Sequence, residues 1–192
     1  MLRPLASSSS TTTRASARVH LFVFVAMQHL GCEFEGGIAA GDERRGWGLN
    51  GGYLASHLIE HLRQPLPLMQ ELHRVCRRDA MAVFVVPYGS SDSAWADPTH
   101  VRPYFLESWI YFGQPAYWRA DYHYRGDWQT ERIILQVERA QYEGVRASDI
   151  LEAARRGRNV IVEMIAELRA IKPIRPPQRE LQRAPEIAIA YV

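Results

Sequence analysis

Apolar residues change their spacing twice between Tyr53 and Pro87. Tyr53 to Ser56 is a short apolar run after two glycines, and Met81 to Pro87 (MAVFVVP) is a longer run rich in β-branched residues. Such runs are typical of parallel strands that are buried on both faces. Between them the apolar residues follow helical spacing: Leu68, Met69, Leu72, Val75 and Cys76. The pattern predicts a strand, a helix and a parallel strand, joined as a right-handed crossover.

The C-terminal part of the chain combines alternating and helical spacing. Apolar and polar residues alternate over residues 133–137 and again over residues 186–191, which predicts two strands. Between these segments the spacing predicts one long helix, capped by Ser148 or Asp149. Its apolar positions are Ile150, Leu151, Ala154, Ile161, Met164, Ile165 and Leu168.

The chain before Tyr53 has one clear element. Residues 19–26 (VHLFVFVA) predict a buried strand, whereas residues 31–52 are rich in glycine and predict a loop. Residues 1–18 form a tail of Ser, Thr and Arg that cannot bury enough apolar surface to fold. The absence of acidic residues from the first 32 positions is typical of a transit peptide, although a disordered or misassigned start is the simpler interpretation. We therefore expect a tail, 1–18, and a single α/β domain, 19–192.

Composition and charge exclude several classes of protein. The 23 basic and 21 acidic residues nearly cancel, so nucleic acid is not an expected partner. No apolar run approaches the roughly 20 residues that span a bilayer, so no membrane partner is expected. Cys32 and Cys76 are isolated, which indicates free thiols in a reducing compartment, and we expect a cytoplasmic protein.

The segment HLIEH, His57 to His61, matches the inverted zinc-protease signature, in which two histidines one helical turn apart bind a metal. Gly51, Gly52, Pro65 and Pro67 leave room for only a short helix around it, which disfavours that interpretation. The possible third ligands follow no recognisable pattern: Asp97, His100, Glu131 and Glu138. No metal is therefore expected.

Two other interpretations of His57 and His61 remain. They are either histidines satisfied by neighbouring polar groups, or the rim of a ligand cleft. Open α/β sheets bind ligands beyond the carboxyl ends of their strands. Both HLIEH and the polar loop after Pro87 begin at such strand ends. A cleft there would bring together His57, Glu60, His61, Tyr88, Asp97 and His100.

Three ordered motifs over residues 53–105 resemble those of one enzyme family. They are ASHLIEHL after a strand, QELHRV on a helix, and VVPY followed by the loop segment DPTHVRPYF. This part of the chain resembles the second half of class I S-adenosylmethionine-dependent methyltransferases of the type-11-like group. The resemblance implies a Rossmann-like sheet, incomplete here, with antiparallel last strands and a long C-terminal helix. It divides the domain into a degenerate cofactor half (19–52), core strands with the acceptor loop (53–141), and a helix with the terminal strand (142–192).

The resemblance also implies the ligands and their sites. S-adenosylmethionine would bind near Gly31, Cys32, Asp42, Ala55 and Ser56. Only 23 residues separate Cys32 from Ala55, which is too few for two full βα units. A small-molecule or glycan-like acceptor would contact Tyr88, Asp97, Arg102 and Tyr104. The catalytic candidates are His57, Glu60, His61 and His100, of which His100 is the preferred general base.

Structural roles compete with these assignments. Asp97 and Arg102 could hold a self-contained loop, and Tyr88 and Tyr104 could pack in the core. For the whole chain, the rival hypothesis is a non-catalytic remnant that serves in binding or assembly. Sheet edges left open by missing strands would then favour a homo-oligomer.

Overall fold

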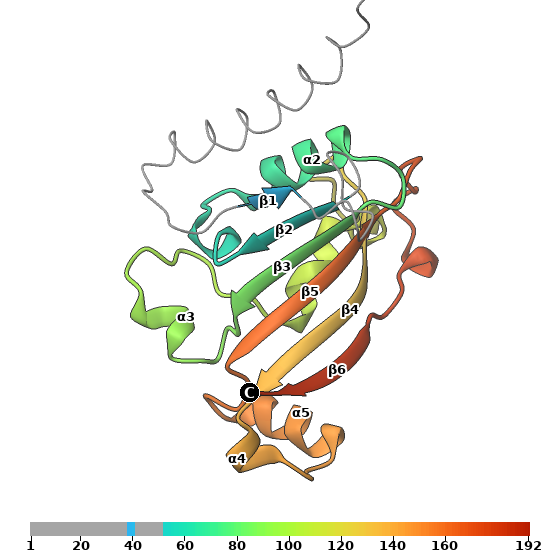
Figure 1. Ribbon diagram of the computed structural model, residues 1–192. Coiled ribbons are helices and arrows are strands. Elements are labelled where there is room, and N and C mark those ends of the chain that lie inside the picture. The colour runs from blue at the N-terminus through green and yellow to red at the C-terminus, as the bar shows by residue number, and fades with distance from the viewer. Residues whose placement is uncertain (1–37, 41–51) are drawn as a thin grey trace, which may run out of the picture. The chain divides into compact units, whose positions relative to one another are not determined.

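The structure, a computed structural model, describes residues 38–40 and 52–192 of the 192-residue chain. The predicted tail 1–18, the predicted strand 19–26 and most of the glycine-rich segment 31–52 lie outside the described residues. In the described part, strands form one open mixed sheet in the order β1-β2-β3-β5-β4-β6 (Figure 1). The strands are β1 (Ile38–Ala40), β2 (Gly52–Ser56), β3 (Met81–Pro87), β4 (Trp128–Val137), β5 (Glu163–Ala170) and β6 (Glu186–Tyr191). The architecture is therefore α/β, as the sequence predicts.

Short helices connect these strands. The α-helices are α2 (Pro65–Val75), α3 (Ser93–Ala96), α4 (Arg139–Tyr142) and α5 (Ala147–Arg156). The 3-10 helices are η2 (Ile59–His61), η3 (Leu106–Phe112), η4 (Gln114–Trp118) and η5 (Arg179–Leu181).

The predicted strand–helix–strand unit is present. β2 and β3 are parallel neighbours in register from Gly52 opposite Met81 to Ser56 opposite Val85. Between them, α2 starts at Pro65, whose fixed φ suits the first turn of a helix. Its residues Met69 and Leu72 are buried. This unit carries the ends of β2 and β3 to the same edge of the sheet.

The predicted long C-terminal helix is wrong. The helix α5 ends at Arg156, directly before Gly157, and residues 163–170 form the strand β5. This strand lies between β3 and β4 and pairs antiparallel with both. Met164 and Leu168 are four residues apart, a spacing that fits a helix face and a strand face alike. Backbone hydrogen bonds to two neighbouring strands decide in favour of the strand. The helix also begins at Ala147, before the predicted caps.

The direction of the last strand also differs from the expectation. The two segments expected to be the antiparallel last strands, 133–137 and 186–191, lie in β4 and β6, and these two strands pair in parallel at the edge of the sheet. The antiparallel neighbour of β4 is β5, which was expected to be helical. The bounds of β6 match the prediction from alternation over residues 186–191.

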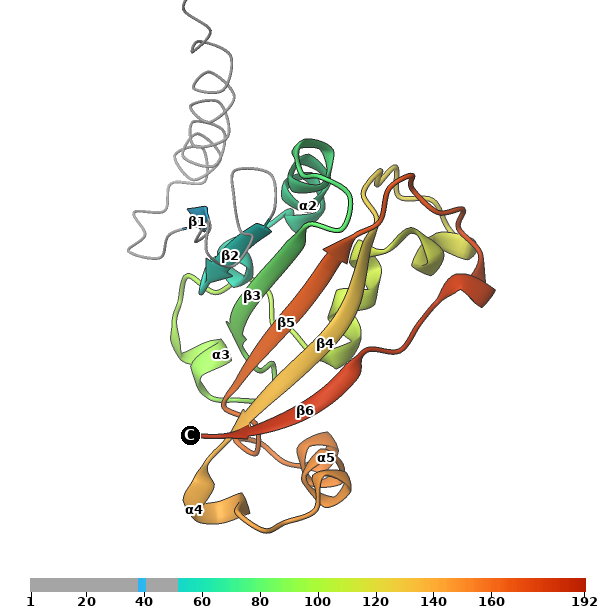
Figure 2. The ribbon, with the colours of Figure 1, turned by 45° about the vertical axis from the view of Figure 1, so that its right-hand side comes forward.

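One face of the sheet holds the core. Ala82, Phe84 and Val86 of β3 are buried, whereas the alternate residues Val83 and Val85 are half-buried. The helices η3 and η4 lie behind the sheet in Figures 1 and 2, and no described helix covers the front. The prediction that β3 is covered on both faces is therefore wrong for the described residues.

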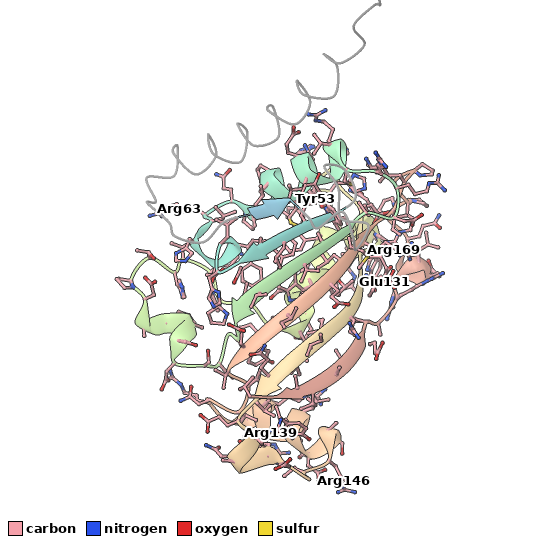
Figure 3. All side chains as sticks on the ribbon, in the orientation of Figure 1. Tyr53, Arg63, Glu131, Arg139, Arg146 and Arg169 are labelled. Atoms are coloured by element: carbon pink, nitrogen blue, oxygen red, sulfur yellow. The ribbon has the colours of Figure 1, made fainter. Side chains whose placement is uncertain are left out.

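Ion pairs occupy part of the less covered face. Arg169 on β5 donates to Glu131 on β4, with 2.7 Å between Nε and Oε1, and the two lie side by side in Figure 3. Arg132 and Glu167 form a second pair across the same strands. Charged side chains thus occupy part of the face that was expected to be buried.

Candidate functional site

The end of β2 leads into a buried 3-10 turn that carries Glu60 and His61. The chain turns at His57, whose φ of 50° lies in the left-handed region. Apolar neighbours then anchor η2, since Leu58 and Ile59 are buried. Because η2 is embedded in this way, Glu60 keeps only 2% and His61 only 8% of its surface exposed. Two polar side chains are thereby held inside the protein.

The loop after β3 is fastened to this turn through its backbone. The N–H groups of Val101 and Arg102 donate to the carbonyl oxygen of Glu60, at 3.0 and 3.2 Å. His100, the preceding residue, is thereby placed against His61, and the ring centroids lie 4.6 Å apart. One potential ligand atom from each of Glu60, His61 and His100 lies within 4.8 Å of the others. We call these three residues the Glu-His-His cluster.

Hydrogen bonds orient both histidines of the Glu-His-His cluster. The hydroxyl of Thr99 donates to Asp97 Oδ1 at 2.6 Å and lies 2.9 Å from His61 Nδ1. Since that hydroxyl proton is directed to Asp97, His61 Nδ1 is the donor to Thr99 Oγ1. His100 Nδ1 donates to the carbonyl of Ala94 at 3.2 Å. Both rings are therefore protonated at Nδ1, with their lone pair on Nε2.

Sequence reasoning did not single out Thr99. Its backbone N–H also donates to Asp97 Oδ1 at 2.7 Å, which is the hydrogen bond of an Asx turn. The segment Asp-Pro-Thr is a recognisable signal for such a turn, and attention to it could have identified Thr99.

The electrostatic environment of Glu60 is unusual for a carboxylate. Neither of its carboxylate oxygens has a hydrogen-bond partner among the described residues. Burial raises the pKa of Glu60 to about 7, and the negative charges of Glu163 and Asp97 add to the rise. Burial and the nearby His100 lower the pKa of His61. At neutral pH, His61 is therefore uncharged and Glu60 is divided between its two protonation states.

His57 lies apart from the Glu-His-His cluster. Its Nε2 is 3.0 Å from Glu163 Oε1 on β5, and its Nδ1 is 2.9 Å from the hydroxyl of Ser56. His57 and His61 therefore have different partners, and the two histidines of the HLIEH segment do not form one pair of metal ligands.

The predicted acceptor residues divide into core and surface positions. Tyr104 is 1% exposed and stacks on Trp109, while Tyr88 is buried against Phe105. Burial raises the pKa of both tyrosines. Arg102 and Asp97 are exposed. Packing thus explains the two tyrosines, whereas Arg102 is available to a ligand.

A cavity of about 970 Å³ lies beside these residues, within the usual range for ligand pockets. Of the predicted acceptor residues, Arg102 and Tyr104 line it. Sequence reasoning missed other polar and aromatic side chains of its wall. They come from segments distant in the chain and give no local signal, and they include Arg63, Gln70, Tyr111, Tyr117, Tyr122 and Tyr124. No residue of the Glu-His-His cluster lines this cavity, so the cluster and the cavity are neighbouring features.

The predicted cofactor residues are placed only in part. Gly31, Cys32 and Asp42 lie outside the described residues. Ala55 and Ser56 end β2, whose other neighbour is the short antiparallel strand β1. No helix in the described ranges 38–40 and 52–192 is long and apolar enough to cross a membrane.

Comparisons with protein-family models and with curated proteins find no match to this chain. The arrangement of its own residues therefore carries the functional argument.

Proposed function

We propose that this chain is a methyltransferase-fold protein that uses S-adenosylmethionine to methylate a small-molecule or glycan-like acceptor. The observation that carries the proposal is the Glu-His-His cluster at the ends of two parallel strands. The family motifs in residues 53–105 lead to the same place, because ASHLIEHL supplies Glu60 and His61 and DPTHVRPYF supplies His100. Under this proposal, β2 and β3 are strands of a Rossmann-like sheet, and α2 is the helix that connects them.

The described residues fit one side of a cofactor site. Ala55 and Ser56 end β2, where a bound S-adenosylmethionine would lie against the sheet. On the other side of β2 is β1, which is short and antiparallel. The remaining cofactor contacts would have to come from residues 1–37 and 41–51, which are outside the described part.

The residues of the acceptor side are suited to a proton transfer. S-adenosylmethionine would supply an electrophilic methyl group. Nε2 of His100 carries the ring lone pair and can take the proton of an acceptor hydroxyl. Asp97 Oδ2, 3.7 Å from that nitrogen, would then face a charged imidazolium. Arg102 and the tyrosines of the adjoining cavity can hold the acceptor by hydrogen bonds and stacking.

Calorimetry with the purified chain and S-adenosylmethionine tests the proposal. We expect saturable binding, and we expect the His100→Asn variant to bind the cofactor equally while losing methyl transfer by roughly 10²–10⁴-fold, the usual contribution of a general base. No binding heat at millimolar cofactor would contradict the enzymatic proposal.

The second candidate function is a non-catalytic binding or assembly module of the same fold. The position of β1 favours it, because an antiparallel strand of three residues occupies the sheet position beside β2. A chain that binds an acceptor-like ligand in the cavity but never S-adenosylmethionine would support this alternative. Cofactor binding would exclude it.

A further inference from the structure

The Glu-His-His cluster has the composition and spacing of a metal site. Two imidazoles and one carboxylate are the protein ligands of one common type of catalytic zinc centre. At zinc–ligand distances of about 2.0–2.2 Å, neighbouring ligand atoms in a tetrahedral site are roughly 3.4 Å apart. The ligand atoms of Glu60, His61 and His100 lie within 4.8 Å of one another. Small side-chain rotations would bring them to coordination distance.

The buried carboxylate of Glu60 is the independent observation that points to a cation. Only 2% of the surface of Glu60 is exposed, and both of its carboxylate oxygens lack a hydrogen-bond partner among the described residues. Burying an ionised carboxylate without a partner is strongly unfavourable. No arginine or lysine of the described part forms an ion pair with it. A metal ion between Glu60 and the two imidazoles would supply the missing positive charge.

The surroundings of both histidines resemble the outer shell of known metal centres. Metal-bound histidines almost always donate their second N–H to a carboxylate, a carbonyl or another fixed acceptor, which orients the ring. His100 Nδ1 donates to the Ala94 carbonyl, and His61 Nδ1 donates to Thr99, which is itself held by Asp97. In both rings the lone pair is consequently on Nε2, the atom that would bind the metal.

We propose that Glu60, His61 and His100 bind one divalent transition-metal ion, with zinc as the best match to the ligand set. The fourth position would be taken by water or by Asp97, whose Oδ2 is 3.7 Å from His100 Nε2. This site differs from the one spelled by HLIEH, because His57 is not a ligand. The proposal does not rest on methyl transfer, and it would hold equally for a non-catalytic protein. A metal on His100 Nε2 would occupy the lone pair that the general-base role requires, so His100 can serve only one of the two roles at a time.

The test measures zinc binding to the full chain after chelator treatment, with no S-adenosylmethionine present. Titration with zinc chloride against a chromophoric competitor is expected to give one tight site per chain. Loss of an outer-shell partner typically weakens a metal site roughly 10–100-fold, and loss of a direct ligand should cost at least as much. We expect Glu60→Gln and His100→Asn to show losses of this size.

His57→Asn is the matched control. It removes a histidine only three residues from Glu60, at a left-handed position that asparagine tolerates. Zinc affinity should be unchanged in this variant. Absence of tight zinc binding to the wild-type chain would overturn the proposal, as would a site lost in His57→Asn and kept in His100→Asn.

A second measurement uses only the wild-type chain, so it still tests the proposal if the variants fail to fold. Histidine ring resonances of the wild-type chain are followed by NMR as one equivalent of zinc is added. The signals of His61 and His100 should shift, while those of exposed His123 should not. A response confined to other histidines would place the metal elsewhere and contradict the proposal.

Discussion

Asp127 is a fully buried residue whose carboxylate is completely paired. It is 0% exposed, and its oxygens accept hydrogen bonds from the backbone and guanidinium of Arg175 and from the N–H of Gln114. Removing one partner of a buried ion pair leaves the other charge uncompensated. We therefore expect Asp127→Ala to lower the free energy of unfolding by about 3–5 kcal/mol in urea denaturation.

Asp121 provides the matched comparison at the surface. It also pairs with an arginine, Arg125, through two hydrogen bonds, but both side chains are exposed. Exposed ion pairs contribute little because water and salt screen them. Asp121→Ala should leave the urea unfolding curve almost unchanged. If Asp121→Ala and Asp127→Ala lowered the free energy of unfolding by similar amounts, burial would not be what makes the Asp127 pair important.

Individual site residues were predictable where they carried recognisable chemistry. The sequence indicated Glu60, His61 and His100 because each is ionisable and follows a predicted strand. It could not show that His57 turns away to Glu163, since that depends on the left-handed backbone at His57 and on the position of β5. The partners of Asp127 were equally invisible, because Arg175 is distant in the chain.

At the level of elements, residues 163–170 offer a direct comparison between the strand β5 and the helix expected from the sequence. In a strand, Met164 and Ile165 point to opposite faces of the sheet, whereas in the helix expected from the sequence they would share one face. Met164 is 0% exposed and Ile165 is half-buried. Met164→Ala should destabilise the protein by about 2–5 kcal/mol, and Ile165→Ala by about 1 kcal/mol.

Denaturation of the two variants under the same conditions gives the comparison. Equal losses of unfolding free energy would indicate that both side chains face one core, as in a helix, and would contradict the assignment of residues 163–170 as a strand. Circular dichroism of each variant is the control that the overall secondary structure is retained.

The local sequence predicted those elements whose apolar pattern fits only one type of secondary structure. β2, α2, β3 and β6 were identified from their runs or their spacing, and their bounds agree closely with the structure. Residues 163–170 fitted both a helix and a strand, and only their two neighbours in the sheet decide between them. The same dependence on distant partners explains why the uncovered face of β3 was not foreseen.

At the scale of the whole molecule, β6 leaves one edge of the sheet without a partner strand in the described part. Ile187 on this strand is 36% exposed. Open strand edges favour pairing between copies, and a lysine on the edge opposes it. We expect concentration-dependent dimers in sedimentation equilibrium, weakened by Ile187→Lys.

Val145→Lys is the control for this experiment. Val145 has a similar exposure, 37%, but lies between α4 and α5 rather than on a strand edge. Its substitution should leave the association constant unchanged. A wild-type chain that stays monomeric at all concentrations would rule out association through β6.

The placement of β5 in the middle of the sheet has a consequence for how the chain acquires its structure during synthesis. β3 leaves the ribosome long before β5, its neighbour in the finished sheet, because β4, three α-helices and two 3-10 helices lie between them in the chain. Pairing between segments so distant in sequence slows folding. Until residues 163–170 are synthesised, the apolar edge of β3 is open to other chains, and this interval is when the protein is most prone to aggregate.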